Sequence, residues 1–152
     1  MSQAKKVFTR MCLNNWGGID HKVLEFHEYV NLFSGKSGSG KSTVMDAIQV
    51  ILYGSFSPSF LNKAADDAKN RRSVLSYLRG EQKDGSANRK DCDFCSVIAL
   101  EIEDTGTHII TCIGIAFEVR KSDSEIKKFV YFSHSGKMPT SGYLTEQGVC
   151  YS

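Results

Sequence analysis

Gly35-Lys36-Ser37-Gly38-Ser39-Gly40-Lys41-Ser42 fits the pattern G-x-x-x-x-G-K-S/T of a phosphate-binding P-loop. The glycines let the backbone turn sharply and bring its N–H groups against phosphate oxygens. Lys41 can reach the β- and γ-phosphates, and the Ser42 hydroxyl can coordinate Mg²⁺. The segment therefore predicts a site for a nucleoside triphosphate with its metal ion.

The flanking segments have the character that a P-loop requires. Tyr29–Phe33 is a short apolar run typical of a strand, and Lys41–Tyr53 carries apolar residues at helical spacing. Gly54 follows at the position of a helix C-terminal glycine. The helix would point its positive end at the same anion. We expect ATP and Mg²⁺ to be held by Gly35, Lys36, Ser37, Gly38, Ser39, Gly40, Lys41, Ser42 and Thr43.

The bulk properties indicate one soluble globular domain. The chain has 152 residues, 41% of them hydrophobic and 24% charged, and a net charge of +2 that by itself does not imply nucleic-acid binding. The five cysteines are odd in number and irregularly spaced, which favours reduced thiols. No apolar run is long enough to span a bilayer, and the N-terminus lacks a signal peptide's apolar stretch, so we expect a cytoplasmic protein.

Strands are predicted on the N-terminal side of the P-loop. Val7–Leu13 alternates in polarity, Asn14–Gly18 has turn composition, and Lys22–Phe26 suggests a second strand. Small P-loop kinases usually place the loop after their first strand, so this arrangement differs from theirs.

The chain after the first helix is predicted to be helical and then β-rich. Leu61–Lys69 is alanine-rich and helical in character, and a second helical segment would be capped by Asn70 and ended by Gly80. Glu81–Asp91 is charged and contains glycine, so we expect an exposed loop.

Two β-rich segments dominate the C-terminal half. Phe94–Glu103 and Thr107–Arg120, with Asp104–Gly106 between them, predict an antiparallel hairpin, and Lys127–Ser133 suggests a further strand. The sequence therefore predicts an α/β P-loop fold with a mixed sheet, antiparallel hairpins and few helices.

A catalytic carboxylate is not evident. Val97–Glu101 is the segment most similar to an apolar strand that ends in an acidic residue. The strand pattern, however, continues to Asp104. We therefore expect Glu101 on the exposed face of a hairpin strand. There is also no Ser-Gly-Gly signature. We expect no catalytic residue in this chain, and little or no ATP hydrolysis by it alone.

Several segments resemble a known group. Leu13–Trp16 and Asn31–Gln49 resemble the N-terminal head of SMC-type ATPases. Leu61–Ala65 and Arg71–Gly80 resemble the SMC-like subunit of the Wadjet plasmid-defence system, which is related to MukB-like bacterial condensins. The resemblance covers residues 7 to 120 and implies the fold of an ABC-type ATPase head.

The resemblance implies that residues 1–152 are the N-terminal lobe of a head interrupted by a long coiled coil. The C-terminal lobe would carry the signature motif, the Mg²⁺-binding aspartate and the catalytic glutamate. Two heads would enclose ATP as a homodimer and act on DNA by loop extrusion or entrapment. The implied partners are kleisin and winged-helix subunits and a toprim-type nuclease.

The resemblance also suggests further site residues. Asn15, with Trp16, would lie near the adenine; simple loop packing is the alternative. Arg72, in a region that also holds Arg71 and Arg79, would approach phosphates or DNA; a solvated helix face is the alternative. Gln147 is the candidate for a Q-loop glutamine near Mg²⁺, because Gln49 lies inside the first helix.

Two further sets of residues could bind zinc or DNA, and for each of them an ordinary structural role is the alternative. Cys92 and Cys95 form a single C-x-x-C pair, and a zinc site would need ligands such as His108 and Cys112 to be brought to it by the fold. Three basic residues of the 81–91 loop could contact DNA phosphates, though a solvated loop is commoner: Lys83, Arg89 and Lys90.

Three rival functions remain open. The first is a nuclease-associated DNA-repair ATPase, which genomic neighbours would distinguish. The second is a small P-loop kinase, which requires alternating strands and helices and a lid rich in arginine. The third is a non-enzymatic domain whose loop binds a structural anion.

Overall fold

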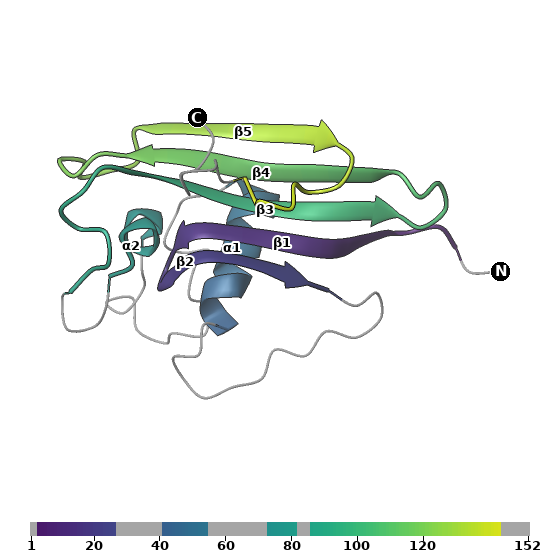
Figure 1. Cartoon of the computed structure of the whole chain (residues 1–152), viewed down its shortest axis with the longest axis horizontal. Helices are drawn as coiled ribbons and strands as arrows, with labels where there is room; N and C mark the ends of the chain where they lie inside the picture. The colour runs from purple at the N-terminus through teal and green to yellow at the C-terminus, as the bar shows by residue number, and fades with distance from the viewer. Residues whose placement is uncertain (1–2, 27–40, 55–72, 82–85, 144–152) are drawn as a thin grey trace.

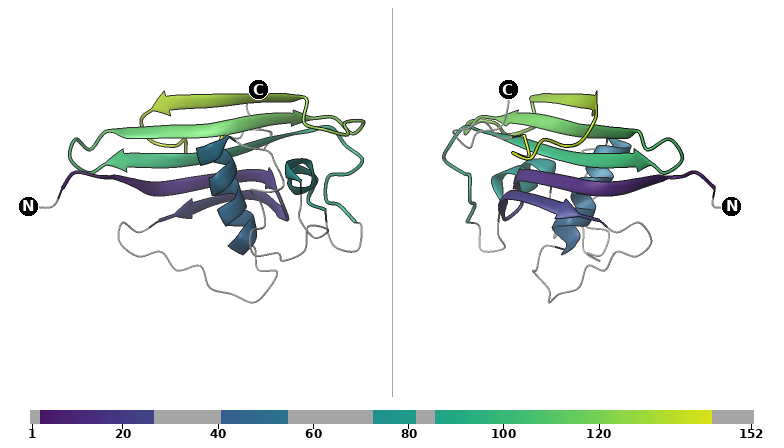
Figure 2. Two further views of the ribbon diagram at one scale, coloured as in Figure 1. Left: turned by 180° about the vertical axis from the view of Figure 1, so that it is seen from behind. Right: turned by 45° about the vertical axis from the view of Figure 1, so that its right-hand side comes forward.

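The computed structural model describes residues 3–26, 41–54, 73–81 and 86–143. They form a five-stranded antiparallel sheet in the order β2-β1-β3-β4-β5, with two helices on one face (Figures 1 and 2). The elements are β1 (Lys6–Trp16), β2 (Ile19–Glu25), α1 (Lys41–Tyr53), α2 (Val74–Arg79), β3 (Phe94–Asp104), β4 (Ile110–Val119) and β5 (Lys128–Ser135). The α/β fold with hairpins and few helices is confirmed.

The sequence predicts a mixed sheet, whereas the five described strands form an antiparallel one. Every strand pairing in the described part is antiparallel. The strand expected at Tyr29–Phe33 and the helix expected at Leu61–Lys69 both fall in segments that the structure does not describe.

The first hairpin is tighter than the sequence suggests. The turn predicted over Asn14–Gly18 is present, but its predicted extent is too wide, because Asn14 and Trp16 still pair with β2. The chain reverses within Gly17 and Gly18 alone. Gly17 has φ +59°, and a Cβ there would stand 2.7 Å from the Thr43 methyl carbon, so the turn needs glycine both for its backbone and for its contact with α1.

α1 packs across the middle of the sheet, as the left view of Figure 2 shows. Its predicted bounds, Lys41–Tyr53, are confirmed, and Gly54 (φ +63°) ends it by donating its N–H to the Val50 carbonyl at 2.9 Å. The helix and sheet share one core. Its largest members are Met11, Leu13, Trp16, Val50, Val74, Tyr77, Leu78, Ile98, Leu100, Ile115 and Phe117.

α2 covers the same face beside α1. Its N-cap is Ser73, whose side chain accepts from the Ser76 N–H, while Asn70, the predicted cap, lies outside the described residues. Gly80 ends the helix in the left-handed conformation (φ +67°), as predicted. Val74, Tyr77 and Leu78 are the buried side of the helix.

The opposite face of the sheet is covered by the segment 136–143, visible in Figure 1 in front of β3 and β4. Met138 and Tyr143 pack there against Cys12, Val97 and Cys112. This face is the second, smaller core.

Glu101 belongs to this second face, and its prediction as an exposed strand residue is wrong. It is only 3% exposed. Its carboxylate accepts from the Thr9 hydroxyl at 2.7 Å and from the Met138 N–H at 2.6 Å. Burial is possible because both oxygens have donors. Glu101 therefore fastens the 136–143 segment to the sheet.

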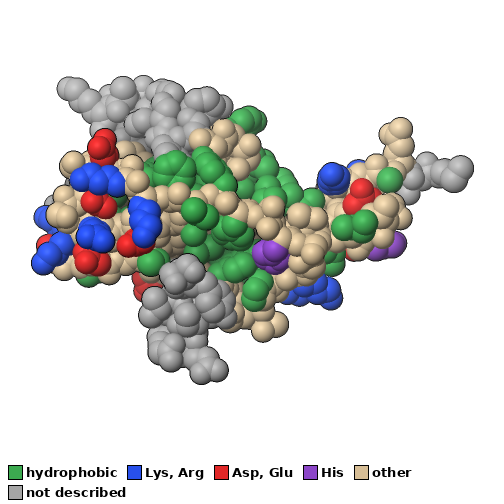
Figure 3. All heavy atoms as spheres, turned by 90° about the horizontal axis from the view of Figure 1, so that it is seen from above, with side chains coloured by type: hydrophobic (Ala, Val, Ile, Leu, Met, Phe, Trp, Pro, Cys, Tyr) green, Lys and Arg blue, Asp and Glu red, His purple; other side chains and the backbone are tan. Residues whose placement is uncertain are grey.

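The two edges of the sheet differ in chemistry. β2 exposes polar and charged side chains, among them Asp20, His21, Lys22 and Glu25. β5 exposes Phe129, Val130 and Tyr131. Figure 3, which looks onto the β5 edge, shows apolar side chains gathered over its middle and charged groups of both signs toward its two ends, densest at one of them.

Candidate nucleotide-binding site

The structure describes part of the predicted site. The residues Gly35–Gly40, Arg72 and Gln147 lie outside the described residues, as do the side chains of Lys41 and Ser42. Asn15, Thr43 and the backbone of the first turn of α1 are described. The described part of the site is therefore the N-terminal end of α1 and the residues packed around it.

The P-loop motif runs into the N-terminal end of α1, as its mechanism requires. The helix begins at Lys41, so the last two motif residues, Lys41 and Ser42, are its first two residues. The first N–H groups of a helix have no partner within it and attract anions together with the helix dipole. The first turn of α1 holds no acidic residue that would repel a phosphate. This end of α1 fits an anionic ligand.

Two buried aromatic side chains border this helix end. The Trp16 indole Nε1 donates to the Thr43 carbonyl at 2.9 Å, and the Tyr77 hydroxyl donates to the Asp46 carboxylate. The two rings stack with centroids 4.9 Å apart and planes 3° from parallel. Asp46 is 4% exposed. β1, α2 and α1 thus meet at the start of the helix.

Trp16 and Asn15 occupy different environments. Trp16 is fully buried and its ring is stacked on Tyr77, so its role in the described structure is packing and anchoring. Asn15 has φ +54°, and its side-chain amide donates to the Cys95 carbonyl at 2.8 Å. Its contact with a nucleotide stays a prediction.

Arg89 is not part of an exposed basic loop, and that part of the prediction is wrong. It is 6% exposed. Its guanidinium donates to the Leu78 carbonyl at 2.7 Å, to the Gly17 carbonyl at 2.6 Å and to Asp20 at 3.1 Å. Burial lowers the pKa of Arg89, and the Asp20 carboxylate acts in the opposite direction. Arg89 joins the end of α2 to the β1–β2 turn.

The other basic residues considered for phosphate or DNA binding have different environments. Arg79 donates to the Asp123 carbonyl at 2.5 Å and so ties α2 to the β4–β5 connection. Lys90 is exposed, and Lys83 and Arg71 lie outside the described residues. The described arginines of this region therefore have structural partners.

The cysteines and histidine considered for zinc are not brought together. Cys95 pairs with Glu118 across the β3–β4 hairpin, and Cys112 pairs with Glu101, farther along the same strands. His108 stands in the hairpin turn, 3.6 Å from Glu103. Among the described residues no group of three His, Cys, Asp or Glu side chains could hold a metal ion. The described cysteines form no disulfide with one another.

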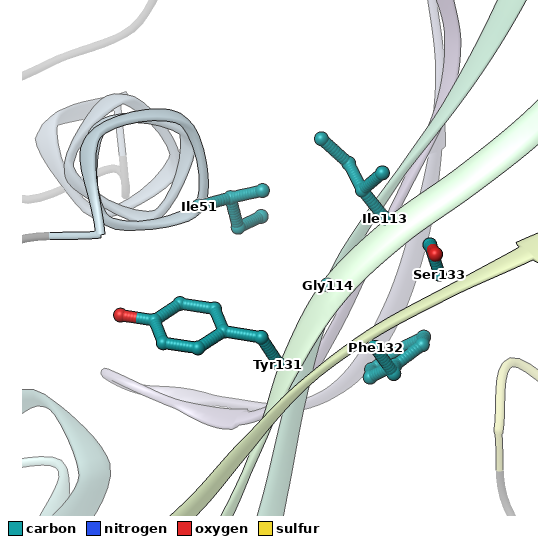
Figure 4. A pocket seen from close by; sticks show the side chains of 6 residues that line it. All are labelled: Ile51, Ile113, Gly114, Tyr131, Phe132 and Ser133. Atoms are coloured by element: carbon teal, nitrogen blue, oxygen red, sulfur yellow. The ribbon is translucent and has the colours of Figure 1, made fainter.

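A separate cavity lies near the other end of α1. It has a volume of about 310 Å³ and is lined by Ile51, Ile113, Gly114, Tyr131, Phe132 and Ser133 (Figure 4). The Tyr131 hydroxyl donates to the Gly54 carbonyl at 3.0 Å, which places this cavity beside the C-terminal end of the helix. Its lining has no charged side chain. The cavity therefore lies away from the end of α1 at which the P-loop motif stands.

Sequence reasoning finds the motif but misses Tyr77. Asp46 stands out in the sequence only as part of a family-typical stretch, and nothing local to Tyr77 signals a partner 31 residues earlier. The contact depends on the packing of α2 on β1 and α1. A tyrosine in a short apolar helix is expected to be buried and to need a hydrogen-bond partner, but the sequence does not say which residue that partner is.

Comparisons with known proteins support a P-loop region in this chain. Residues 8–68 match the family described as the P-loop containing region of AAA domain. The chain is also 39% identical over 74 residues to the C subunit of nuclease SbcCD from Staphylococcus haemolyticus, a match that covers 46% of this chain and 6% of that protein. The chain thus contains a P-loop region, and just under half of it is similar to a small part of that nuclease subunit. Among the described helices, none has the length and apolar character needed to cross a membrane.

Proposed function

We propose that this chain is the nucleotide-binding N-terminal lobe of an SMC-like ATPase that acts on DNA. The observation that carries the proposal is the continuity of the motif Gly35–Ser42 with a helix that begins at Lys41 and is buried against an antiparallel sheet. The absence of acidic residues from the first turn of α1 supports a phosphate ligand. The matched P-loop region and the SbcC-type relative support the same class.

The residues would divide the work in binding ATP and Mg²⁺. The main-chain N–H groups from Gly35 to Gly40 would surround the phosphates, and the Lys41 ammonium would neutralise their charge. Ser42 would coordinate Mg²⁺, while Thr43 would continue the cradle into α1. Arg72 is proposed at the phosphates, Asn15 near the base and Gln147 near the metal. The ion supplies charge stabilisation at the phosphates when it is bound.

Hydrolysis would need residues from outside this chain. Glu101, the nearest imitation of a catalytic carboxylate, already accepts two hydrogen bonds on the face of the sheet opposite α1. We therefore propose that the catalytic carboxylate comes from a C-terminal lobe and that a second head completes the site. ATPase activity would belong to that full assembly.

The described architecture argues against a small P-loop kinase. Such an enzyme alternates strands and helices, whereas β1 and β2 form a hairpin before α1, and β3, β4 and β5 follow one another without a helix. Phosphoryl transfer to a small acceptor by this chain alone would reverse this choice.

Two finer assignments are distinguished by different observations. The stretches Leu61–Ala65 and Arg71–Gly80 favour the Wadjet type, with kleisin and winged-helix subunits, a toprim-type nuclease and a role in plasmid defence. The similarity to the SbcCD nuclease component favours a nuclease-associated repair ATPase. Kleisin and winged-helix genes beside this one would select the first. A neighbouring nuclease gene without them would select the second.

Thermal unfolding with and without MgATP tests the proposal. A ligand that binds only the folded state at 100 times its Kd stabilises it by about 2.7 kcal/mol. We expect the unfolding temperature of the wild-type chain to rise with MgATP and that of Lys41→Ala to stay constant. Equal shifts in both proteins, or none in the wild type, would refute the assignment.

A further inference from the structure

The first turns of α1 are held by two hydrogen bonds that come from outside the helix. Trp16 reaches the Thr43 carbonyl from the end of β1, and Tyr77 reaches the Asp46 carboxylate from α2. Positions 43 and 46 are three residues apart and so lie on the same side of the helix. Thr43 is two residues after Lys41, at the place where the P-loop becomes helix.

The two donors form one unit, which we term the Trp16–Tyr77 clamp. Their rings are stacked, and both side chains are almost completely buried, with exposed fractions of 0% and 1%. The Gly17 N–H donates to the Tyr77 carbonyl at 2.7 Å, which ties the backbones together as well. A displacement of one ring would therefore displace the other, and the clamp would act on α1 as a rigid body.

Directional contacts are needed here because apolar packing does not fix the helix fully. The buried Val44, Ala47 and Val50 side chains hold α1 on the sheet, but their contacts are non-directional. Two hydrogen bonds to fixed atoms restrict both the rotation of the helix and its movement along its axis. The buried Asp46 carboxylate also makes any position without a donor unfavourable.

We propose that the Trp16–Tyr77 clamp positions the nucleotide site, with Trp16 and Tyr77 as positioning residues that act through α1. The clamp fixes where the first turn of α1 stands, and with it the backbone N–H groups at the start of the helix that would bind the phosphates. This inference rests on the proposed nucleotide-binding function. Small displacements matter at such a site, since a shift of about 1 Å can cost about 100-fold in an enzyme's rate.

Two variants remove the hydrogen bonds and keep an aromatic ring at each position, although the ring left by Trp16→Phe is smaller than the indole. Tyr77→Phe deletes the hydroxyl, and Trp16→Phe deletes the indole N–H. Thr9→Val is the matched control, because it deletes a hydroxyl that donates to a buried carboxylate, Glu101, in the part of the structure that holds the segment 136–143. MgATP affinity is measured by isothermal titration calorimetry at a temperature where all variants are fully folded.

We expect each clamp variant to bind MgATP about 2- to 10-fold more weakly than wild type, the range that one net hydrogen bond represents. Thr9→Val should bind within about 2-fold of wild type although it loses a comparable hydrogen bond. Wild-type affinity in both clamp variants would overturn the positioning role and leave the proposed function intact. An equal loss in Thr9→Val would overturn it as well, since the effect would then be general. A wild-type chain that does not bind MgATP would refute the proposed function, and the inference with it.

Discussion

Replacing Arg89 removes three hydrogen bonds at once, and the expected loss of stability can be worked out from its partners. The Leu78 and Gly17 carbonyls each accept from the guanidinium inside the protein. A hydrogen bond to a charged group contributes about 1.5–3 kcal/mol to stability. That contribution is lost when the buried acceptor is left without a donor. The ion pair with Asp20 adds little, because that carboxylate side chain is 85% exposed. The guanidinium also lies over the Phe94 ring, 5.6 Å from its centroid.

For the two carbonyl bonds together we therefore expect Arg89→Ala to lower the free energy of unfolding by about 3–6 kcal/mol, measured by urea denaturation. Arg89→Lys should recover only part of this loss, because one ammonium group cannot reproduce a planar fork that reaches two carbonyls. Lys90→Ala, next in sequence and exposed, is the control and should change stability by less than about 0.5 kcal/mol. A loss below about 1 kcal/mol in Arg89→Ala would refute the reasoning, and full retention in Arg89→Lys would show that charge alone matters.

Three further predictions concern other parts of the molecule. Glu101→Ala should destabilise the protein by about 2–3 kcal/mol in urea, because the Thr9 hydroxyl and the buried Met138 N–H lose their acceptor; an effect under about 0.5 kcal/mol would contradict its fastening role. Gly80→Ala should cost at least about 1 kcal/mol in thermal unfolding, since φ is +67° and a Cβ would stand 2.6 Å from the Gly17 carbonyl oxygen; Gly18→Ala, with no atom within 4 Å, is its control. Burial raises the pKa of the Cys112 thiol, so the folded state keeps its proton where the unfolded chain loses it, and stability should fall as the pH rises above about 8.5 and toward the folded pKa. Cys112→Ser should flatten that fall, and a thiol reagent should label the exposed Cys92 well before Cys112; equal labelling rates would contradict the burial.

Local signals in the sequence predict the secondary structure well. Periodicity and Gly54 give α1 its bounds, and turn composition gives the β3–β4 hairpin, where the Asp104 carboxylate accepts from the Gly106 and Thr107 N–H groups at 2.9 and 3.1 Å. These features depend on residues close in sequence, so their signals are local.

The errors arise where distant residues decide the outcome. The sequence places Glu101 on an exposed face because alternation along a strand cannot show that the segment 136–143 covers that face. It places Arg89 in a solvated loop because the carbonyl partners of that side chain, Leu78 and Gly17, are 11 and 72 residues away. The composition of the loop around Arg89 predicts neither of these two contacts. The same limit explains why the P-loop can be recognised from its motif while the Trp16–Tyr77 clamp against α1 carries no local signal.

The central claim is that the loop leading into α1 binds a triphosphate. Titration of MgATP into the ¹⁵N-labelled chain, followed by amide chemical shifts, tests it most directly. We predict that the largest saturable changes fall on residues 35–43 and on the first turn of α1, and that Lys41→Ala abolishes them. Changes centred on the cavity beside Ile51 and Tyr131, or none at millimolar nucleotide, would contradict the account.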